Sequence, residues 1–191
     1  MGFDPAQKIA NFVRGEPCEA SNNDEGLLIR EGTFHRCYWV SFADSIRWVV
    51  RFPLPSMTSS DIVNDKISNE VATLKFLTQQ TSIPVPAVVG YGFDGGDHPT
   101  SLPFIILKHV SGFPLSSRWE GLTPEQWHKV FDELTDILLD LNSHHFNHIG
   151  ALGLDESGNW TLSRPPINSP TAHLKIDRVE ICMNPMALFA L

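Results

Sequence analysis

Three short segments rich in β-forming residues follow one another near the start of the chain, and no other feature constrains the fold as much. They are Leu27–Glu31, Tyr38–Phe42 and Arg47–Phe52. Aromatic and β-branched residues favour strands, and connections this short favour antiparallel neighbours. Pro53 and Pro55 end the third segment, because proline cannot donate a ladder hydrogen bond. The sequence therefore predicts an antiparallel meander of three strands.

A helix and two further strands are predicted after the meander. Apolar residues recur at helical spacing from Ile67 to Leu77, and this helix should end near Gln80. Apolar runs at Val88–Val89 and Phe104–Leu107 have the lengths and bounding turns of strands. The predicted fold class is therefore α+β, with a five-stranded antiparallel sheet and one helix.

A second long helix should begin after a linker. Thr123 is a cap residue, Pro124 suits the first helical position, and Gln126 completes a capping box. A stripe of apolar side chains at helical spacing follows, which we expect to be buried against a partner surface. The stripe consists of Trp127, Val130, Phe131, Leu134, Ile137, Leu138 and Leu141.

The chain divides into four parts. Residues 1–26 hold a short helix, at about Pro5–Val13, and a polar turn, and residues 27–110 hold the sheet and its helix. Residues 111–162 hold the linker and the second long helix. Residues 163–191 are predicted to be irregular, because the chain from His148 on is poor in periodicity and rich in Pro, Gly and Ser.

Charge and cysteine content narrow the class of protein. The 191 residues have a formal net charge of −8 and no basic patch, so nucleic acid is not an expected partner. No apolar run approaches the length of a membrane span, and no secretory signal is found, so no membrane association is expected. Cys18, Cys37 and Cys182 are far apart and predict neither disulfides nor a metal site. We therefore expect a cytoplasmic protein in a reducing compartment.

Four stretches carry the functional signal. They are the turn Arg30–Arg36, the strand end Val49–Pro53, the helical run Asn69–Leu77, and the strand and its exit Phe104–Gly112. Singly, each has a plain structural interpretation: a hairpin turn, a basic residue at a strand end, a solvated helix and a buried strand. In this order they resemble the aminoglycoside-phosphotransferase-like (APH-like) family of small-molecule kinases, and the resemblance extends over about Leu27–Leu162.

The resemblance implies a protein-kinase-like small lobe that binds ATP, followed by the first helix of an incomplete large lobe. It assigns Gly32 and Thr33 to the turn that covers the nucleotide phosphates. Arg51 stands where kinases carry the lysine that pairs with the phosphates, and arginine keeps the charge and can bind phosphate with two hydrogen bonds. Glu70 is the expected helix partner of Arg51.

The resemblance also assigns a hinge that reads the adenine edge with its backbone. The Lys108 carbonyl and the Val110 N–H would make those hydrogen bonds, and Leu107 would stand at the back of the pocket. Backbone recognition tolerates substitution, which suits a Lys-His pair where relatives often carry Glu-Tyr.

The carboxylates that phosphoryl transfer needs are missing from the sequence. The family carries a His-x-Asp catalytic loop and a later metal-binding Asp, but none of the eight histidines has Asp two places on. His173, with Asp177 four places later, does not match the motif. We therefore expect a chain truncated before the catalytic loop, which holds a nucleotide without kinase activity of its own. Mg²⁺ is expected only for a complete parent enzyme, whose small-molecule acceptor the sequence does not reveal.

The sequence leaves two functions open. The chain is either the front part of an ATP-dependent kinase of small hydroxylated molecules, or a non-catalytic, pseudokinase-like module that binds a nucleotide or a partner. A third reading is that it does not fold stably alone, because apolar surface meant for a large lobe is exposed.

Three further patterns are better explained without a functional site. Gly90–Gly95 matches the dinucleotide fingerprint, but the Gly and Pro residues that follow prevent the helix which that fingerprint must open. His144 and His148 have a spacing that could bind zinc, but no third ligand is evident. Three aspartates that share one helix face are interpreted as a solvated face. They are Asp132, Asp136 and Asp140.

Overall fold

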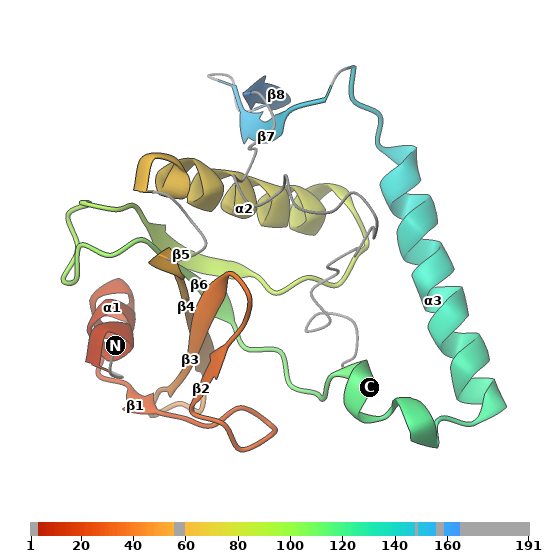
Figure 1. The fold of residues 1–191 in the computed structure, drawn as a ribbon, viewed down its shortest axis with the longest axis horizontal. Coiled ribbons are helices and arrows are strands. Elements are labelled where there is room, and N and C mark those ends of the chain that lie inside the picture. The colour runs from red at the N-terminus through yellow and green to blue at the C-terminus, as the bar shows by residue number, and fades with distance from the viewer. Residues whose placement is uncertain (1–3, 56–59, 148, 156–158, 165–191) are drawn as a thin grey trace.

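An antiparallel sheet forms the centre of the computed structural model, which describes residues 4–55, 60–147, 149–155 and 159–164 (Figure 1). Within these residues it has six strands in the order β1-β3-β4-β6-β5, with β2 paired to β3. The strands are β1 (Glu19–Ala20), β2 (Ile29–Glu31), β3 (His35–Ser41), β4 (Arg47–Pro53), β5 (Val88–Gly92) and β6 (Phe104–Lys108). The predicted α+β class and the five predicted strands are confirmed. The sequence did not reveal β1, because two exposed residues have no recognisable pattern.

The alternation of side chains along β4 separates the two faces of the sheet. Val50 and Phe52 belong to a hydrophobic core that includes residues of α1 (Asp4–Arg14). Arg51, between them, points to the opposite face. The short N-terminal helix was predicted correctly, and its amphipathic character explains why it covers the sheet. Its buried residues are Ala6, Ile9 and Ala10.

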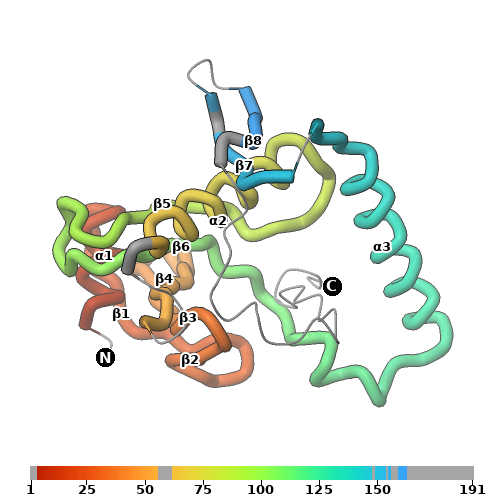
Figure 2. Tube along the Cα trace, turned by 45° about the horizontal axis from the view of Figure 1, so that its top comes forward, coloured from red at the N-terminus to blue at the C-terminus, as the bar shows by residue number. Residues whose placement is uncertain are grey.

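The opposite face of the sheet is covered by α2 (Ser60–Gln80), which ends where the sequence predicts (Figures 1 and 2). Ile67 and Val71 of α2 pack against Ile105 and Leu107 of β6. This packing fixes the rotation of α2 about its axis. It therefore decides which polar residues of the helix lie against β4.

The second long helix, α3 (Pro124–Ser143), begins with the predicted capping box. The Thr123 side chain accepts a hydrogen bond from the Gln126 N–H, and the Gln126 side chain accepts one from the Thr123 N–H. The expected burial of its apolar stripe is wrong for the residues that the structure describes. Trp119, in the short helix η3 (Trp119–Gly121), packs edge-on against Trp127 at the start of the stripe, but further along Phe131 is 57% exposed and Leu138 53%.

The C-terminal end of α3 is tied to the C-terminal end of α2. The Asp140 carboxylate accepts hydrogen bonds of 2.7 Å from both the N–H and the hydroxyl of Ser82. The ring of His144 packs edge-on against Phe76 of α2, with the centroids 5.2 Å apart. The interpretation of Asp140 as part of a solvated face is therefore wrong, because the fold brings Ser82 to it. Asp132 and Asp136 are exposed, as expected.

A hairpin of β7 (Ala151–Leu154) and β8 (Trp160–Arg164) follows α3. Trp160 packs edge-on against Phe76, which is why the hairpin lies beside α2. These strands were not predicted from the sequence, although residues 160–162 include the β-formers Trp160 and Thr161. The irregular segment predicted for residues 163–191 begins too early, since β8 reaches Arg164, and the residues after it lie outside the described part.

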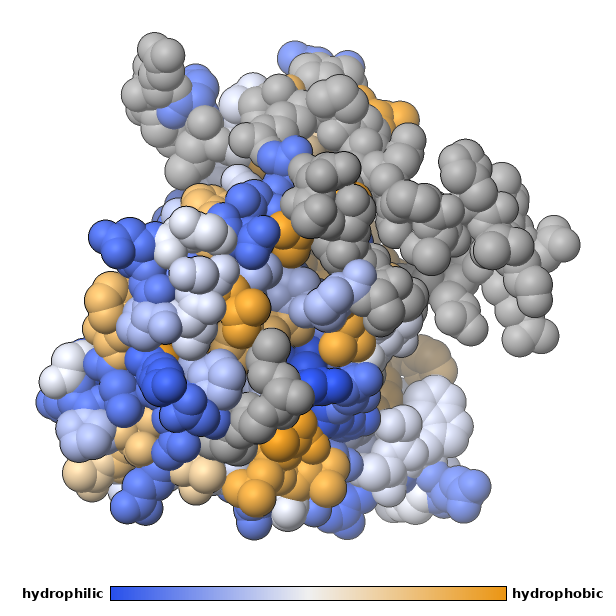
Figure 3. Space-filling view, turned by 60° about the vertical axis from the view of Figure 1, so that its left-hand side comes forward, coloured by the Kyte–Doolittle hydropathy of each residue, from blue (hydrophilic) through white to orange (hydrophobic). Residues whose placement is uncertain are grey.

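Hydrophobic residues are exposed at several places on the described surface. On the face that Figure 3 shows, they form a patch near the lower edge and smaller groups between hydrophilic residues. Among the described helices, none is long and apolar enough to cross a membrane.

Candidate functional site

The two charged residues that the sequence paired, Arg51 on β4 and Glu70 on α2, lie in contact. The Arg51 Nη1 donates a hydrogen bond of 2.7 Å to the Glu70 Oε1. The Arg51 side chain is 14% exposed and that of Glu70 26%, so the pair is mostly buried but still reaches solvent. The packing of α2 on β6 produces this contact, because it turns Glu70 toward β4.

A third residue, His35 at the start of β3, completes the cluster. Its Nδ1 lies 3.1 Å from the Arg51 Nη2, and its Nε2 lies 3.4 Å from the Glu70 Oε2. The sequence alone did not indicate a role for His35. The signal was present in the strand pattern, because His35 and Cys37 share a face of β3 and Cys37 pairs with Arg51 across the sheet.

The cluster keeps the Glu70 carboxylate charged. Burial by itself would raise the pKa of Glu70, but the hydrogen bond from His35 and the charge of Arg51 outweigh it, and the pKa lies below its ordinary value. The neighbouring thiol behaves differently. Burial raises the pKa of Cys37, although the Arg51 charge acts in the opposite direction.

We expect the lowered pKa of Glu70 to make stability depend on pH. A carboxyl group with a depressed folded-state pKa stabilises the protein above its ordinary pKa of 4.5, and this contribution is lost as the pH falls through the lower folded-state value. Glu70→Gln should therefore lower the free energy of unfolding by about 1–2 kcal/mol near neutral pH. The difference from the unchanged protein should shrink below pH 4.5 in urea unfolding experiments. The exposed Glu120→Gln is the control, and an equal, pH-independent loss in both variants would contradict the prediction.

The turn predicted to cover nucleotide phosphates is a tight hairpin between β2 and β3. The Gly32 N–H donates a hydrogen bond of 2.8 Å to the His35 carbonyl, and the Leu54 N–H donates one of 2.8 Å to the Phe34 carbonyl. A Cβ on Gly32 would meet no atom closer than 3.6 Å, so the protein alone does not require glycine there. Thr33 lies at the exposed tip of this turn.

The predicted hinge leaves the sheet at the end of β6. Leu107 is buried beside α2, whereas the Lys108 side chain is exposed, as a backbone-reading role allows. The Lys108 N–H donates to the Ala87 carbonyl at 2.9 Å. Within the described residues, the Val110 N–H makes no hydrogen bond, so it remains available to a ligand.

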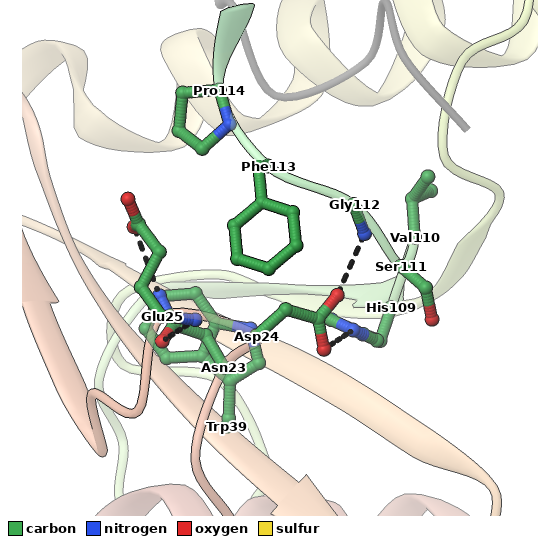
Figure 4. Close-up of a pocket in the computed structure, with 10 residues that line it drawn as sticks. All are labelled: Asn23, Asp24, Glu25, Trp39, His109, Val110, Ser111, Gly112, Phe113 and Pro114. Atoms are coloured by element: carbon green, nitrogen blue, oxygen red, sulfur yellow. Dashed lines mark hydrogen bonds and ion pairs between the residues drawn. The ribbon is translucent and has the colours of Figure 1, made fainter. Parts of the chain in front are cut away.

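The loop before β2 is fastened to the hinge by Asp24, which sequence reasoning missed. Its carboxylate accepts hydrogen bonds from the Gly112 N–H at 2.6 Å and from Arg47 at 2.9 Å, and it lies 3.5 Å from the His109 Nε2. Figure 4 shows the contacts of Asp24 with Gly112 and His109, in a small cavity that Trp39 also lines. Burial by itself would raise the pKa of Asp24, but the hydrogen bonds from Arg47 and Gly112 outweigh burial, so the pKa lies below its ordinary value. These contacts of Asp24 fix the path of the chain directly after the hinge.

The structure explains the dinucleotide-like glycines and the histidine pair without a functional site. Gly90 and Gly92 lie in β5, which a turn follows, so no helix N-terminus is available for a pyrophosphate. His144 packs against Phe76, and His148 lies outside the described residues. In the described part of the chain, no group of three His, Cys, Asp or Glu side chains is arranged to hold a metal ion.

Comparisons with known proteins agree with this fold. The model of the Phosphotransferase enzyme family, APH, matches residues 25–167. The Rio2 kinase of Chaetomium thermophilum, solved as an ADP/Mg²⁺-phosphoaspartate complex, superposes with a TM-score of 0.50. That match covers 88% of this chain and 52% of the kinase at 15% identity, and it supports the protein-kinase-like fold alone.

Fungal relatives share the same region. "Altered inheritance of mitochondria protein 9, mitochondrial" of Clavispora lusitaniae is 34% identical over 135 residues, which are 65% of this chain and 21% of that protein. The protein of the same name from Candida tropicalis is 32% identical over 161 residues, 78% of this chain and 26% of that protein. The chain therefore spans only about a fifth to a quarter of these relatives.

The names of the relatives correct one expectation. A cytoplasmic location was expected, but these relatives are named as mitochondrial proteins. The expectation rested on charge and cysteine spacing, which do not distinguish the cytosol from another compartment.

The match over residues 25–167, together with the kinase-like sheet and helix that those residues form, shows that the chain belongs to the phosphotransferase enzyme family.

Proposed function

We propose that this chain is the nucleotide-holding part of a phosphotransferase that uses ATP to phosphorylate a hydroxyl group of a small molecule. The observation that carries the proposal is the Arg51–Glu70 ion pair, 2.7 Å long, between β4 and α2. An arginine held by a carboxylate presents its remaining N–H groups in a fixed direction, which suits a phosphate. In the proposal Arg51 binds the nucleotide phosphates, and Glu70 orients it.

The other proposed contacts surround this pair. The Lys108 carbonyl and the Val110 N–H would hold the adenine edge, with Leu107 behind it, and the Gly32–Thr33 turn would lie over the phosphates. The Val110 N–H, which makes no hydrogen bond to the residues that the structure describes, and the exposed position of Gly32 and Thr33 support these roles. We further propose that the protein acts in mitochondria, as the names of its relatives indicate.

In the proposal, the described residues hold a nucleotide but not its Mg²⁺. No described cluster of carboxylates could hold the ion, and the sequence contains no His-x-Asp motif. In the proposal, Mg²⁺ binding and the orientation of the acceptor hydroxyl therefore depend on residues that this chain does not contribute. The second candidate function is a non-catalytic module that binds a nucleotide or a partner. It is favoured by the lack of a His-x-Asp motif in this sequence.

A binding experiment with the purified chain tests the proposal. ATP at millimolar concentration should raise the melting temperature, since a ligand that binds only the folded state stabilises it. Titration with a fluorescent ATP analogue should show competition by ATP, and no ADP should be released. Absence of ATP binding at millimolar concentration would overturn the nucleotide-holding role. ADP release that Arg51→Ala abolishes would show that the chain is catalytic by itself.

The proposed hinge makes a separate prediction. Val110→Pro removes the N–H that would bind adenine, so ATP affinity should fall about tenfold. Lys108→Ala keeps every backbone group of the hinge and should change affinity less than about twofold. Calorimetric titration of both variants measures the difference, and melting temperatures establish that each is folded. Equal losses in the two variants would contradict backbone recognition.

A further inference from the structure

The cluster around Arg51 is closed by His35, which contacts both members of the ion pair. The three side chains come from different elements: His35 from β3, Arg51 from β4 and Glu70 from α2. One terminal nitrogen of Arg51 contacts Glu70 at 2.7 Å, and the other contacts the His35 Nδ1 at 3.1 Å. The second imidazole nitrogen lies 3.4 Å from Glu70. The guanidinium is therefore held at both ends rather than by a single carboxylate.

The geometry also determines where the imidazole proton lies. A guanidinium has only donors, so the His35 Nδ1 that faces Arg51 must accept. A neutral ring then carries its proton on Nε2, where it faces the Glu70 carboxylate. This tautomer satisfies both neighbours at once. A protonated ring would place a second positive charge against Arg51 and lose the acceptor.

The backbone of His35 has a second role in the same place. Its carbonyl accepts the hydrogen bond from the Gly32 N–H that closes the turn between β2 and β3. One residue thus fixes that turn through its main chain and fixes Arg51 through its side chain. We propose that His35 is a positioning residue that couples the phosphate-covering turn to the Arg51–Glu70 pair; this inference rests on the proposed nucleotide-holding role.

The coupling also explains why arginine suits position 51. A planar guanidinium can bind Glu70 with one nitrogen and His35 with the other, and further N–H groups remain for a phosphate. A lysine ammonium is a point charge without this fork, so Arg51→Lys should keep the ion pair and lose the contact with His35.

Paired titrations with ATP and adenosine test the proposal, because only ATP has phosphates for Arg51 to contact. His35→Ala should weaken ATP binding about tenfold and leave adenosine binding within about twofold. His35→Asn, whose amide oxygen can replace the Nδ1 acceptor, should recover most of the ATP affinity. In an Arg51→Ala background, His35→Ala should add little further loss, as expected for a residue that acts through Arg51. His128→Ala, on the exposed surface of α3, is the histidine control and should change neither affinity.

Other results of these titrations would overturn either the positioning role of His35 or the proposed function. Unchanged ATP binding in His35→Ala, or equal losses for ATP and adenosine, would overturn the positioning role. If the unchanged protein binds neither ligand, the proposed function fails instead. The ring contacts can still be judged by ¹⁵N NMR of the His35 imidazole. A proton on Nε2 that shifts in Arg51→Ala and Glu70→Gln is the expected result, and a proton on Nδ1 would overturn the arrangement.

Discussion

Gly92→Ala is expected to lower the free energy of unfolding by about 2–3 kcal/mol, because the methyl group has no room. A Cβ at this position would lie 2.3 Å from the Phe104 Cε1 and 2.9 Å from the His98 ring. Phe104 is only 2% exposed and belongs to the core between the sheet and α1, so its ring cannot move aside. Urea unfolding followed by tryptophan fluorescence measures the loss.

Two variants make this test specific. Gly121→Ala is the control, because a Cβ there meets no atom within 4 Å, and its stability should change by less than about 0.5 kcal/mol. Phe104→Leu shortens the opposing side chain, so the effect of Gly92→Ala should be smaller in that background. If Gly92→Ala is as harmless as Gly121→Ala, the close packing of β5 against β6 is not as described. A confirmed loss would show that the packing of Phe104 requires glycine at this position.

Arg51→Ala is expected to weaken ATP binding by about 10–100-fold. A hydrogen bond to a charged group contributes about 1.5–3 kcal/mol, and the variant removes the cation proposed to contact the phosphates. It also leaves Glu70 without its ion-pair partner, so a carboxylate would repel the incoming phosphates. Calorimetric titration with ATP measures the affinity, and adenosine binding should change little.

Lys8→Ala is the matched control for Arg51→Ala. It also removes one positive charge, but Lys8 is an exposed residue of α1 that pairs with Asp4, on the other side of the sheet from Arg51. Its ATP affinity should stay within about twofold of the unchanged protein. Equal losses in the two variants would indicate a general effect of net charge. ATP affinity that Arg51→Ala leaves unchanged would overturn the role proposed for this arginine.

Local signals were enough for most elements of the fold. The β-rich segments, the end of α2 at Gln80 and the capping box at Thr123 depend on residues close in sequence, and all three were predicted. The order of these elements was not enough to identify the family, which the four motif stretches between Arg30 and Gly112 indicated. The contact of Arg51 with Glu70 followed from that resemblance, and the packing of α2 on β6 explains it physically.

Other features depended on which distant segments meet. Asp24 holds Gly112 across a large separation in the chain, and Asp140 holds Ser82 in the same way. In sequence, neither aspartate differs from a solvated one. The apolar stripe of α3 shows the opposite case. Its periodicity predicts a buried face, but burial requires a partner, and the described elements leave Phe131 and Leu138 more than half exposed.

The sequence by itself determined the elements of this protein, their order and the identity of the residues at its proposed nucleotide site. The tertiary structure decided that His35 joins Arg51 and Glu70, and that Gly92 must lack a side chain. Strand register and helix rotation set those contacts. Both are fixed by long-range packing, such as that of Val71 on Ile105, which no local pattern encodes.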